Sequence, residues 1–372
     1  MTALYIERED QLALVYDALV DSDVLFLDTE FESRASGTTL CVLQVTDRDS
    51  TFLIDAITVP DLSSLGQAIG RREQTWVVHA GRQDVELLMD ALNLSQRPEI
   101  FDTQIGWSLV SAEYQVSLAY LEAVICGLRV SKGRQTSNWK KRPLTDAQIE
   151  YAIGDVLYLP KIYDTINARL IERGRPDSVY SASKEIFEPP KKETTSVSLS
   201  SYRNLWQLDA AQKAALEVLV NHYNDSKSAR GGPHYKTLFS IAARLPQNAD
   251  ELSEIKGVHR RWASQAERRL LPDMLEAAED AENQDTQNQA PPTPYGSFDD
   301  HCREAWLQCA RADICADTHI APELAFPGWL MKRLKASIHH VSDPKRLSEE
   351  FVGWRSCLIE PWERFCDDTY PQ

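Results

Sequence analysis

Residues 24–59, VLFLDTEFESRASGTTLCVLQVTDRDSTFLIDAITV, decide the fold of the N-terminal half of this chain. They contain three runs rich in β-branched and aromatic residues, VLFLDTEF, LCVLQVTD and STFLIDAI, separated by polar turn residues. Such runs are typical of strands, and three in succession predict an antiparallel meander. The apolar run WVVHA at 76–80 adds a buried strand. Helical patterns around these runs then predict a mixed-sheet α/β domain over residues 1–175.

The C-terminal half of the chain reads as helical, with two polar, proline-containing interruptions. Residues 176–200 and residues 283–294 are predicted to be linkers because proline and small polar residues break regular structure. These linkers delimit two all-helical domains, over residues 201–282 and 295–372.

The composition indicates a globular protein of the cytoplasm. The 372 residues contain seven scattered cysteines without a CxxC pair, which argues for reduced thiols. We see no secretory signal and no apolar run long enough for a membrane helix. The absence of a GxxxxGK[ST] motif argues against a nucleotide cofactor, and we expect a monomer. The net charge of −16 is unusual for a protein that binds nucleic acid, although local basic clusters remain.

Acidic residues stand in or beside apolar sequence at three places in the predicted α/β domain. Asp28 and Glu30 occupy positions i and i+2 of the first strand and therefore project from one face. Asp84 falls in the first turn of a helix, where the helix dipole favours negative charge. Tyr151 and Asp155, at i and i+4, share one face of a later helix.

Each motif alone has an ordinary structural explanation: a strand-end turn, an acid in a first helical turn, or a Tyr–Asp pair on an amphipathic helix. Their occurrence together favours a functional site. Unpaired carboxylates are costly in apolar surroundings, and no neighbouring stretch supplies enough Lys or Arg to neutralise them. Hard divalent cations such as Mg²⁺ and Mn²⁺ take carboxylate oxygens as ligands. The four acids therefore predict a metal site with a spacing that fits a two-metal nuclease.

The sequence segments DTEF, HAGRQD and YAIGD resemble the three exonuclease motifs of the DEDD superfamily, in its tyrosine-bearing branch. The neighbouring segments LQV, FDTQ and RPLTDAQIEYAIGDVLYL extend the resemblance to the bacterial ribonuclease D family, from about residue 20 to the end of the chain. The two helical segments resemble the HRDC domains of that family more loosely. One departure is Asn138, where the family usually has an acid before the Trp that precedes the third motif. The resemblance implies an RNase H-like exonuclease domain followed by two small all-α HRDC-like domains.

The resemblance also implies an activity. It is that of a 3′→5′ exoribonuclease that releases 5′-mononucleotides by two-metal-ion hydrolysis, with Mg²⁺ or Mn²⁺, at the 3′ ends of tRNA precursors and other structured RNAs. Asp28 would bridge both ions, and Glu30 and Asp155 would complete the site of the attacking water. Asp84 would support the second ion, and Tyr151 would orient the water or help to deprotonate it.

RNA must be held by local side chains, because no domain of the chain is basic as a whole. The predicted contacts are Thr29, Phe31, Lys132, Arg134, Lys140, Lys141 and Arg142. Phe31 can either stack on a terminal base or pack at the strand end. A 3′→5′ exonuclease acting on DNA would use the same five site residues. A non-catalytic RNA-binding scaffold is a weaker alternative, because such proteins usually lose one or more of the metal acids.

Overall fold

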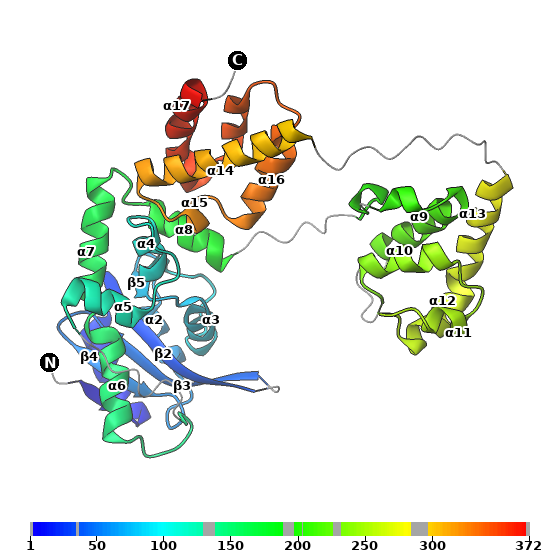
Figure 1. The fold of residues 1–372 in the computed structure, drawn as a ribbon. Coiled ribbons are helices and arrows are strands. Elements are labelled where there is room, and N and C mark those ends of the chain that lie inside the picture. The colour runs from blue at the N-terminus through cyan, green and yellow to red at the C-terminus, as the bar shows by residue number, and fades with distance from the viewer. Residues whose placement is uncertain are drawn as a thin grey trace. The chain divides into compact units, whose positions relative to one another are not determined.

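The structure is a computed structural model that describes residues 3–34, 37–128, 138–188, 197–202, 204–225, 232–283 and 297–369. The chain forms two compact units (Figure 1). Unit 1 combines Met1–Pro190 with Asp299–Gln372, and unit 2 is Lys191–Phe298. Each unit has its own apolar core.

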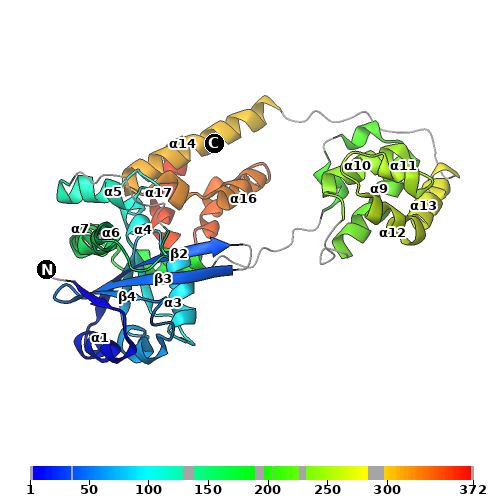
Figure 2. The ribbon, with the colours of Figure 1, turned by 90° about the horizontal axis from the view of Figure 1, so that it is seen from below.

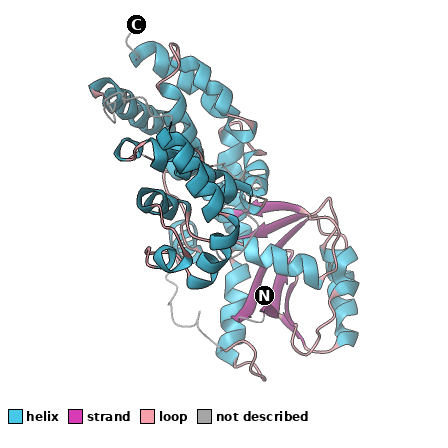
Figure 3. Ribbon diagram, turned by 90° about the vertical axis from the view of Figure 1, so that its right-hand side faces the viewer, coloured by secondary structure: helices cyan, strands magenta, loops and turns pink. Residues whose placement is uncertain are grey.

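Unit 1 is built on one six-stranded mixed sheet with the order β1-β4-β3-β2-β5-β6. The strands are β1 (Leu4–Ile6), β2 (Val24–Arg34), β3 (Gly37–Thr46), β4 (Thr51–Asp55), β5 (Thr75–Val78) and β6 (Glu99–Asp102). β3 runs antiparallel to β2 and β4, which confirms the predicted meander, while the remaining pairs are parallel. The predicted mixed sheet with flanking helices is confirmed (Figure 3).

β2 and β3 continue beyond the strands beside them. Their pairing extends from Phe26 opposite Thr46 to Arg34 opposite Gly37, with a bulge after Glu30. β4 pairs with β3 only as far as Val42. The distal ends of β2 and β3 therefore leave the sheet as a two-stranded ribbon (Figure 1).

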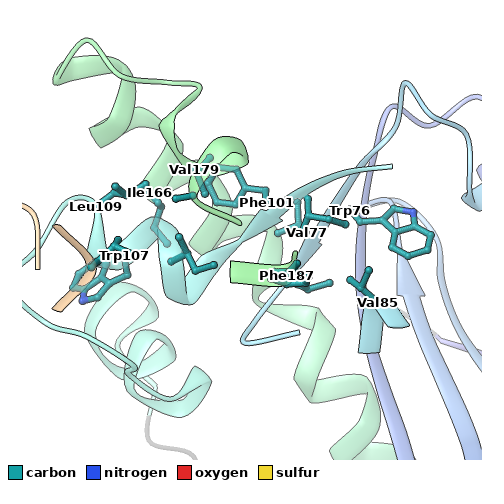
Figure 4. Close-up of a cluster of buried hydrophobic side chains, with 14 of the residues drawn as sticks. Trp76, Val77, Val85, Phe101, Trp107, Leu109, Ile166, Val179 and Phe187 are labelled. Carbon is teal, nitrogen blue, oxygen red and sulfur yellow. The ribbon is translucent and has the colours of Figure 1, made fainter. Parts of the chain in front are cut away.

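Eight helices accompany the sheet within the described part of residues 1–190. They are α1 (Leu12–Leu19), α2 (Gly66–Ile69), α3 (Arg82–Ala91), α4 (Thr103–Ser108), α5 (Leu118–Leu121), α6 (Asp146–Leu157), α7 (Leu159–Glu172) and α8 (Ser178–Phe187). Their apolar side chains bury the sheet. Figure 4 shows part of this core, where Phe101 of β6 lies among Val77 of β5, Ile166 of α7 and Val179 of α8.

The helix α8 differs from the predicted linker over residues 176–200. Val179, Ala182 and Phe187 bury one face of this helix, and α8 packs on β6. The prolines of this segment flank the helix instead of interrupting it, which is why they resembled the signature of a linker. Residues 189–196 of the predicted linker lie outside the described residues.

The last helical segment belongs to unit 1 and does not stand alone. It contains α14 (Phe298–Thr318), α15 (Pro322–Ala325), α16 (Gly328–Ile338) and α17 (Ile359–Thr369), which pack on one another (Figure 2). The Ala321 amide donates to the Ser108 carbonyl at 2.7 Å. Arg355 donates to the Glu185 carboxylate of α8 at 2.6 Å. These contacts make residues 299–372 part of the same core as the sheet.

Unit 2 is all-helical, as predicted for residues 201–282. It contains α9 (Ala210–Asp225), α10 (Tyr235–Arg244), α11 (Ala249–Ser253), α12 (Arg260–Arg269) and α13 (Leu271–Asn283) around an apolar core. Residues 284–294 of the second predicted linker lie outside the described residues. No helix in the described ranges of either unit is long and apolar enough to cross a membrane.

Candidate active site

Three carboxylates that are far apart in the sequence meet on one face of β2. One oxygen from each of Asp28, Glu30 and Asp155 lies within 4.8 Å of the other two, and all three side chains are partly buried. Asp28 and Glu30 share this face because side chains alternate along a strand. The helix α6 packs on β2 and β3 and carries Asp155. The predicted convergence of the first and third motifs is therefore present in the structure.

Burial and mutual repulsion raise the pKa of each of these carboxyls. Burial, followed by the charges of Asp84, Asp155 and Glu30, holds the pKa of Asp28 well above its usual range. Burial, followed by the charges of Asp155 and Asp84, raises the pKa of Glu30 to about 8. Burial, followed by the charge of Glu122, raises the pKa of Asp155 to about 7. The cluster therefore lacks positive charge.

Asp84 approaches the cluster from the opposite side of β2. β5 pairs with β2 only as far as Phe26, so the edge of β2 beyond this point is free of β5, and the first turn of α3 lies next to it. The Thr29 hydroxyl donates a short hydrogen bond to the Asp84 carboxylate. Asp84 is not one of the three closest acids, yet its charge contributes to the raised pKa of both Asp28 and Glu30. Burial raises the pKa of Asp84 itself.

Two residues fix the turn that leads from β5 to Asp84. A Cβ at Gly81 would lie 2.6 Å from the Val78 side chain, so only glycine fits there without movement. The buried Asp102 accepts hydrogen bonds from the backbone amides of Ala80 and Gly81, each at 3.1 Å. Asp102 also caps α4. It thereby ties the end of β6 to the start of α3 and holds Asp84 in position.

Tyr151 stands one turn before Asp155 on α6. The helix begins with the predicted capping box, in which Thr145 and Gln148 hydrogen-bond to each other's backbone amides. The Tyr151 hydroxyl and the Asp155 carboxylate are close enough for each to affect the pKa of the other. Its ring lies 6.1 Å from the buried ring of Trp139, centroid to centroid. Burial, followed by the charges of Asp155 and its neighbours, raises the pKa of Tyr151 above its ordinary value.

The predicted RNA contacts fall into three groups. Lys132 and Arg134 lie outside the described residues. Phe31 and Lys140 lie at the β2–β3 ribbon, where the Lys140 ammonium donates to the Thr39 hydroxyl at 3.1 Å, and Lys141 is exposed. Thr29 is only 6% exposed, and its hydroxyl hydrogen-bonds to the Asp84 carboxylate. Its side chain therefore orients Asp84 and is not available to contact RNA.

Arg142 differs from its predicted role as an RNA contact. Its guanidinium binds both oxygens of the Asp55 carboxylate, which is fully buried, and donates to the Cys41 carbonyl at 2.9 Å. Tyr5 donates to the same carboxylate. Sequence spacing placed Arg142 in a basic cluster, but the buried charge of Asp55 on β4 requires a partner. Arg142 thus anchors the loop before α6 to the sheet.

Two residues that act on the site, Asp102 and Glu122, escaped the sequence analysis, and Thr29 was given a different role. Asp102 lies in the segment FDTQ, between a strand and a helix. An acid at this position is a helix N-cap signal that could have identified it. The hydroxyl of Thr29 was assigned to RNA and not to Asp84. Glu122 precedes the third motif by many residues, and the sequence gave no local signal that its charge raises the pKa of Asp155.

Comparison with known proteins agrees with this geometry. A family model described as a 3′–5′ exonuclease matches residues 4–171, which span the whole sheet and reach into α7. A ribonuclease D of Acidiphilium cryptum is 27% identical over 371 residues, which cover 95% of this chain and 90% of that protein. A ribonuclease D of Sphingobium indicum is 30% identical over 258 residues, which cover 66% of this chain and 65% of that protein.

Among solved structures, the fold is similar to that of Escherichia coli RNase D, described as an exoribonuclease involved in structured RNA processing. The TM-score is 0.59 at 23% sequence identity, and the match covers 100% of both chains. The exonuclease match across the sheet and the near full-length ribonuclease D relative point to the same conclusion as the acids gathered around β2. The chain therefore carries a 3′–5′ exonuclease domain over residues 4–171 and is a relative of the ribonuclease D proteins along nearly its whole length.

Proposed function

We propose that this protein removes nucleotides one at a time from the 3′ end of RNA and releases 5′-mononucleotides, with two divalent ions at the Asp28 cluster. The observation that carries the proposal is the grouping of one oxygen each from Asp28, Glu30 and Asp155 within 4.8 Å in a partly buried setting. The near full-length similarity to ribonuclease D proteins supports RNA as the substrate. We further propose that structured RNAs such as tRNA precursors are the natural substrates and that the protein acts as a monomer.

The residues of the cluster fit a pair of hard dications. All the grouped donor atoms are carboxylate oxygens, which Mg²⁺ and Mn²⁺ prefer. In the described ranges, no Lys or Arg forms an ion pair with Asp28, Glu30, Asp84 or Asp155. Burial and repulsion alone raise the pKa of these carboxyls, so bound cations would relieve an unfavourable arrangement of charge.

Each residue of the site would have a separate role in the reaction. Two divalent ions, when bound, would stabilise charge on the attacking and leaving oxygens of the phosphodiester. The charges of both Asp84 and Asp155 act on Asp28, which would be shared between the two ion sites. Glu30 and Asp155 would hold the ion on the side of the attacking water, and Asp84, oriented by Thr29, would support the other. The Tyr151 hydroxyl would orient the attacking water.

RNA would enter along the β2–β3 ribbon. Lys140 hydrogen-bonds to this ribbon. Lys140 and the exposed Lys141 that follows it would contact phosphates, and Phe31 on β2 would lie next to the terminal base. Charge reversal at Lys140 and Lys141 should raise the KM for RNA and reduce the dependence of binding on salt, because each phosphate contact releases counterions. An unchanged salt dependence with an unchanged KM would remove these lysines from the interface.

Unit 2 offers a second basic surface. Arg261, Arg268 and Arg269 are exposed on α12. We propose that unit 2 and the last helical segment are the two HRDC-like domains of this protein and that they help to hold structured RNA.

Digestion of end-labelled RNA tests the activity. With metal, a 5′-labelled RNA should yield a ladder of products shortened from the 3′ end, and a 3′-labelled RNA should release labelled mononucleotide at once. Chelator should stop both reactions. Internal fragments from the 5′-labelled RNA, or faster digestion of a DNA of the same sequence, would contradict the proposal. The second outcome would favour a DNA exonuclease.

The variant Asp28→Asn tests the site itself. It should abolish cleavage while RNA binding stays largely intact, because the acid is needed for the ions and not for the phosphate contacts. Glu150→Gln, which removes an exposed acid from α6, is the matched control and should remain active. Cleavage by Asp28→Asn at the wild-type rate would place the active site elsewhere.

A further inference from the structure

Gln44 is a buried polar residue of β3 that lies directly beside the acidic cluster. In the register of the two strands, Gln44 is opposite Asp28 of β2. Residues opposite each other on antiparallel strands share one face of the sheet, with their Cβ atoms about 4.5–5.5 Å apart. The Gln44 side chain therefore lies on the face of the sheet that carries Asp28 and Glu30.

Apolar side chains surround Gln44 away from the cluster. Leu53 of β4 is opposite Gln44 in the next strand pair and is itself buried. The helix α6 packs on β2, β3 and β4, and its Ala152 belongs to the same apolar cluster as Leu53. Gln44 is completely buried. Its amide thus lies beneath the helix that carries Tyr151 and Asp155.

Neither polar atom of the Gln44 side chain has a hydrogen-bond partner within the described ranges. This holds for the amide nitrogen Nε2 and for the amide oxygen Oε1. Burial of an amide without partners is unfavourable, and such groups in native proteins are nearly always satisfied. An apolar residue would fill the position without this cost, as Leu53 does beside it. The working protein should therefore supply an acceptor for Nε2 and a donor for Oε1.

We propose that Gln44 is a positioning residue of the metal site: its Nε2 donates a hydrogen bond to the Asp28 carboxylate, and its Oε1 accepts one from a water bound to the ion that Asp28 holds. This inference rests on the proposed function. Mg²⁺ in proteins usually keeps several of its waters. A water on a cation donates hydrogen bonds, and a ligating carboxylate accepts them. An amide is able to serve both, whereas an ionised carboxylate only accepts.

The position of Gln44 suits this role. Its side chain has three rotatable bonds and starts from a Cβ atom next to that of Asp28, so its amide is able to reach the carboxylate. Hydrogen-bond partners of ligating carboxylates fix the orientation of the ligand and strengthen metal binding. Asp28 is the acid that both ions would share, so its orientation affects both ion sites.

A second explanation keeps Gln44 away from the metal. The indole nitrogen of Trp139 is also buried without a partner in the described ranges, and Trp139 belongs to the same apolar cluster as Leu53. One trapped water between Gln44 and Trp139 would satisfy both groups. Gln44 would then have only a structural role, and its replacement would leave metal affinity unchanged. Binding of the metal alone, without RNA and without any measurement of activity, separates the two explanations.

Calorimetric titration of the metal-free protein with Mn²⁺ tests the proposal. Gln44→Met keeps the length of the side chain but removes the amide, and it should weaken Mn²⁺ binding by about 10-fold to 100-fold. Leu53→Met is the matched control, because it changes the packing beneath α6 without removing a polar group. It should bind Mn²⁺ as tightly as wild type. In chelator, Gln44→Met should melt at or above the wild-type temperature, because no unpaired amide is left.

An NMR measurement on the wild-type protein needs no substitution. The two side-chain amide protons of Gln44 should change their chemical shifts and exchange more slowly with solvent when Mg²⁺ saturates the site. Unchanged shifts and unchanged exchange would overturn the proposal, even if Gln44→Met failed to fold.

The outcomes also separate this inference from the proposed function. A Mn²⁺ affinity of Gln44→Met within about twofold of wild type would overturn the role of Gln44, since loss of such a partner has a larger effect. Equal weakening by Leu53→Met would also overturn it, because packing and not the amide would be responsible. Asp155→Asn tests the metal site itself. If this variant binds Mn²⁺ as tightly as wild type, the proposed function fails, whereas its loss of binding with Gln44→Met unaffected removes only Gln44.

Discussion

Asp28 illustrates how the site is built at the scale of single residues. It lies on β2 with Glu30 beside it, Asp155 above it on α6 and Asp84 across the strand on α3. Burial and these three charges all favour its protonated form. The surrounding fold therefore holds these carboxylates close together despite their mutual repulsion, and bound cations would offset that repulsion.

Stability without metal should depend on pH. The pKa of Glu30 is raised from 4.5 to about 8 and that of Asp155 from 3.8 to about 7, so the folded protein binds these protons more tightly than the unfolded chain. This contribution to the free energy of unfolding is fully present below the unfolded pKa values and is lost as the pH rises through 7 and 8. Urea denaturation in chelator should show a decrease in stability between pH 5 and pH 8.5.

Asp155→Asn is the control for that pH dependence. It removes one of the titrating groups, so its stability should decrease less steeply over the same pH range. Saturating Mn²⁺ should also flatten the wild-type curve, because the metal replaces the protons. Identical slopes for wild type and variant would show that Asp155 does not carry a raised pKa in the folded protein.

Tyr151 should act as a neutral hydrogen-bond donor and not as a base. Its pKa is raised by burial and by the acids around it, so the phenolate is strongly disfavoured. Tyr151→Phe should lower the single-turnover rate by about 10²-fold or more, the usual cost of losing one positioned donor. Mn²⁺ affinity should stay within twofold of wild type. Loss of metal binding in this variant would mean that the hydroxyl holds Asp155 in place and does not act on the water.

The sequence could predict which residues of the site share a face, because that depends only on the period of one element. It predicted the pairing of Asp28 with Glu30 and of Tyr151 with Asp155 in this way. It could not predict that Thr29 binds Asp84 or that Arg142 binds Asp55. Those contacts join elements that are distant in the chain, and a hydroxyl or a guanidinium has the same local pattern whether it faces solvent or a buried acid.

At the scale of whole elements, the strands that contain an uninterrupted apolar run were predictable, and β6 was not. β2, β3 and β4 follow from continuous β-branched and aromatic runs. β6 contains only four residues and runs directly into α4, so it carries too little pattern to be recognised. α8 was hidden by its flanking prolines, which a linker and a short helix both tolerate.

The contact between Arg142 and Asp55 is the main anchor of the loop that precedes α6. Asp55 is completely buried and Arg142 is 17% exposed, so removal of the guanidinium leaves a buried charge without its cation. We expect Arg142→Ala to lower the free energy of unfolding by about 3–5 kcal/mol. Urea denaturation of unit 1 measures the change.

The neighbouring Lys141→Ala is the matched control for Arg142→Ala. Lys141 is exposed and no ion pair of its side chain occurs in the described ranges, so the variant should keep wild-type stability within about 0.5 kcal/mol. Equal effects of the two substitutions would show that the loop does not depend on the buried pair.

At the scale of the molecule, unit 1 is assembled from two separate stretches of sequence with unit 2 between them. The helical periodicity of residues 295–372 predicts that one face of each helix is buried, but periodicity does not identify the surface that covers it. Only the structure shows that this surface belongs to α4 and α8.

Replacement of residues 191–298 by a flexible Gly/Ser linker should therefore leave unit 1 folded. The variant should digest short single-stranded RNA at close to the wild-type rate and lose activity on tRNA-like precursors, because only long, structured RNA reaches beyond the active site. Parallel digestion of both substrates measures the ratio. An equal loss on both would show that unit 2 does not select structured RNA.

Deletion of residues 299–372 is the contrasting variant. It should destabilise the nuclease part as well, because Arg355, Trp354 and Ala321 would no longer cover Glu185 and Ser108. A drop in melting temperature of the remaining chain checks this expectation. An unchanged melting temperature would show that the sheet domain is stable without the last helices.

The split assembly of unit 1 has a consequence for biosynthesis. A ribosome delivers the strands, α6 and α8 long before it delivers α14 to α17, and all of unit 2 is translated in between. During that interval the surface of α4 and α8 around Ser108 and Glu185 has not yet received the helices that cover it in the finished protein. Chaperones would find a binding site there, and a protein cut short by a premature stop codon would keep that surface exposed and be open to proteases.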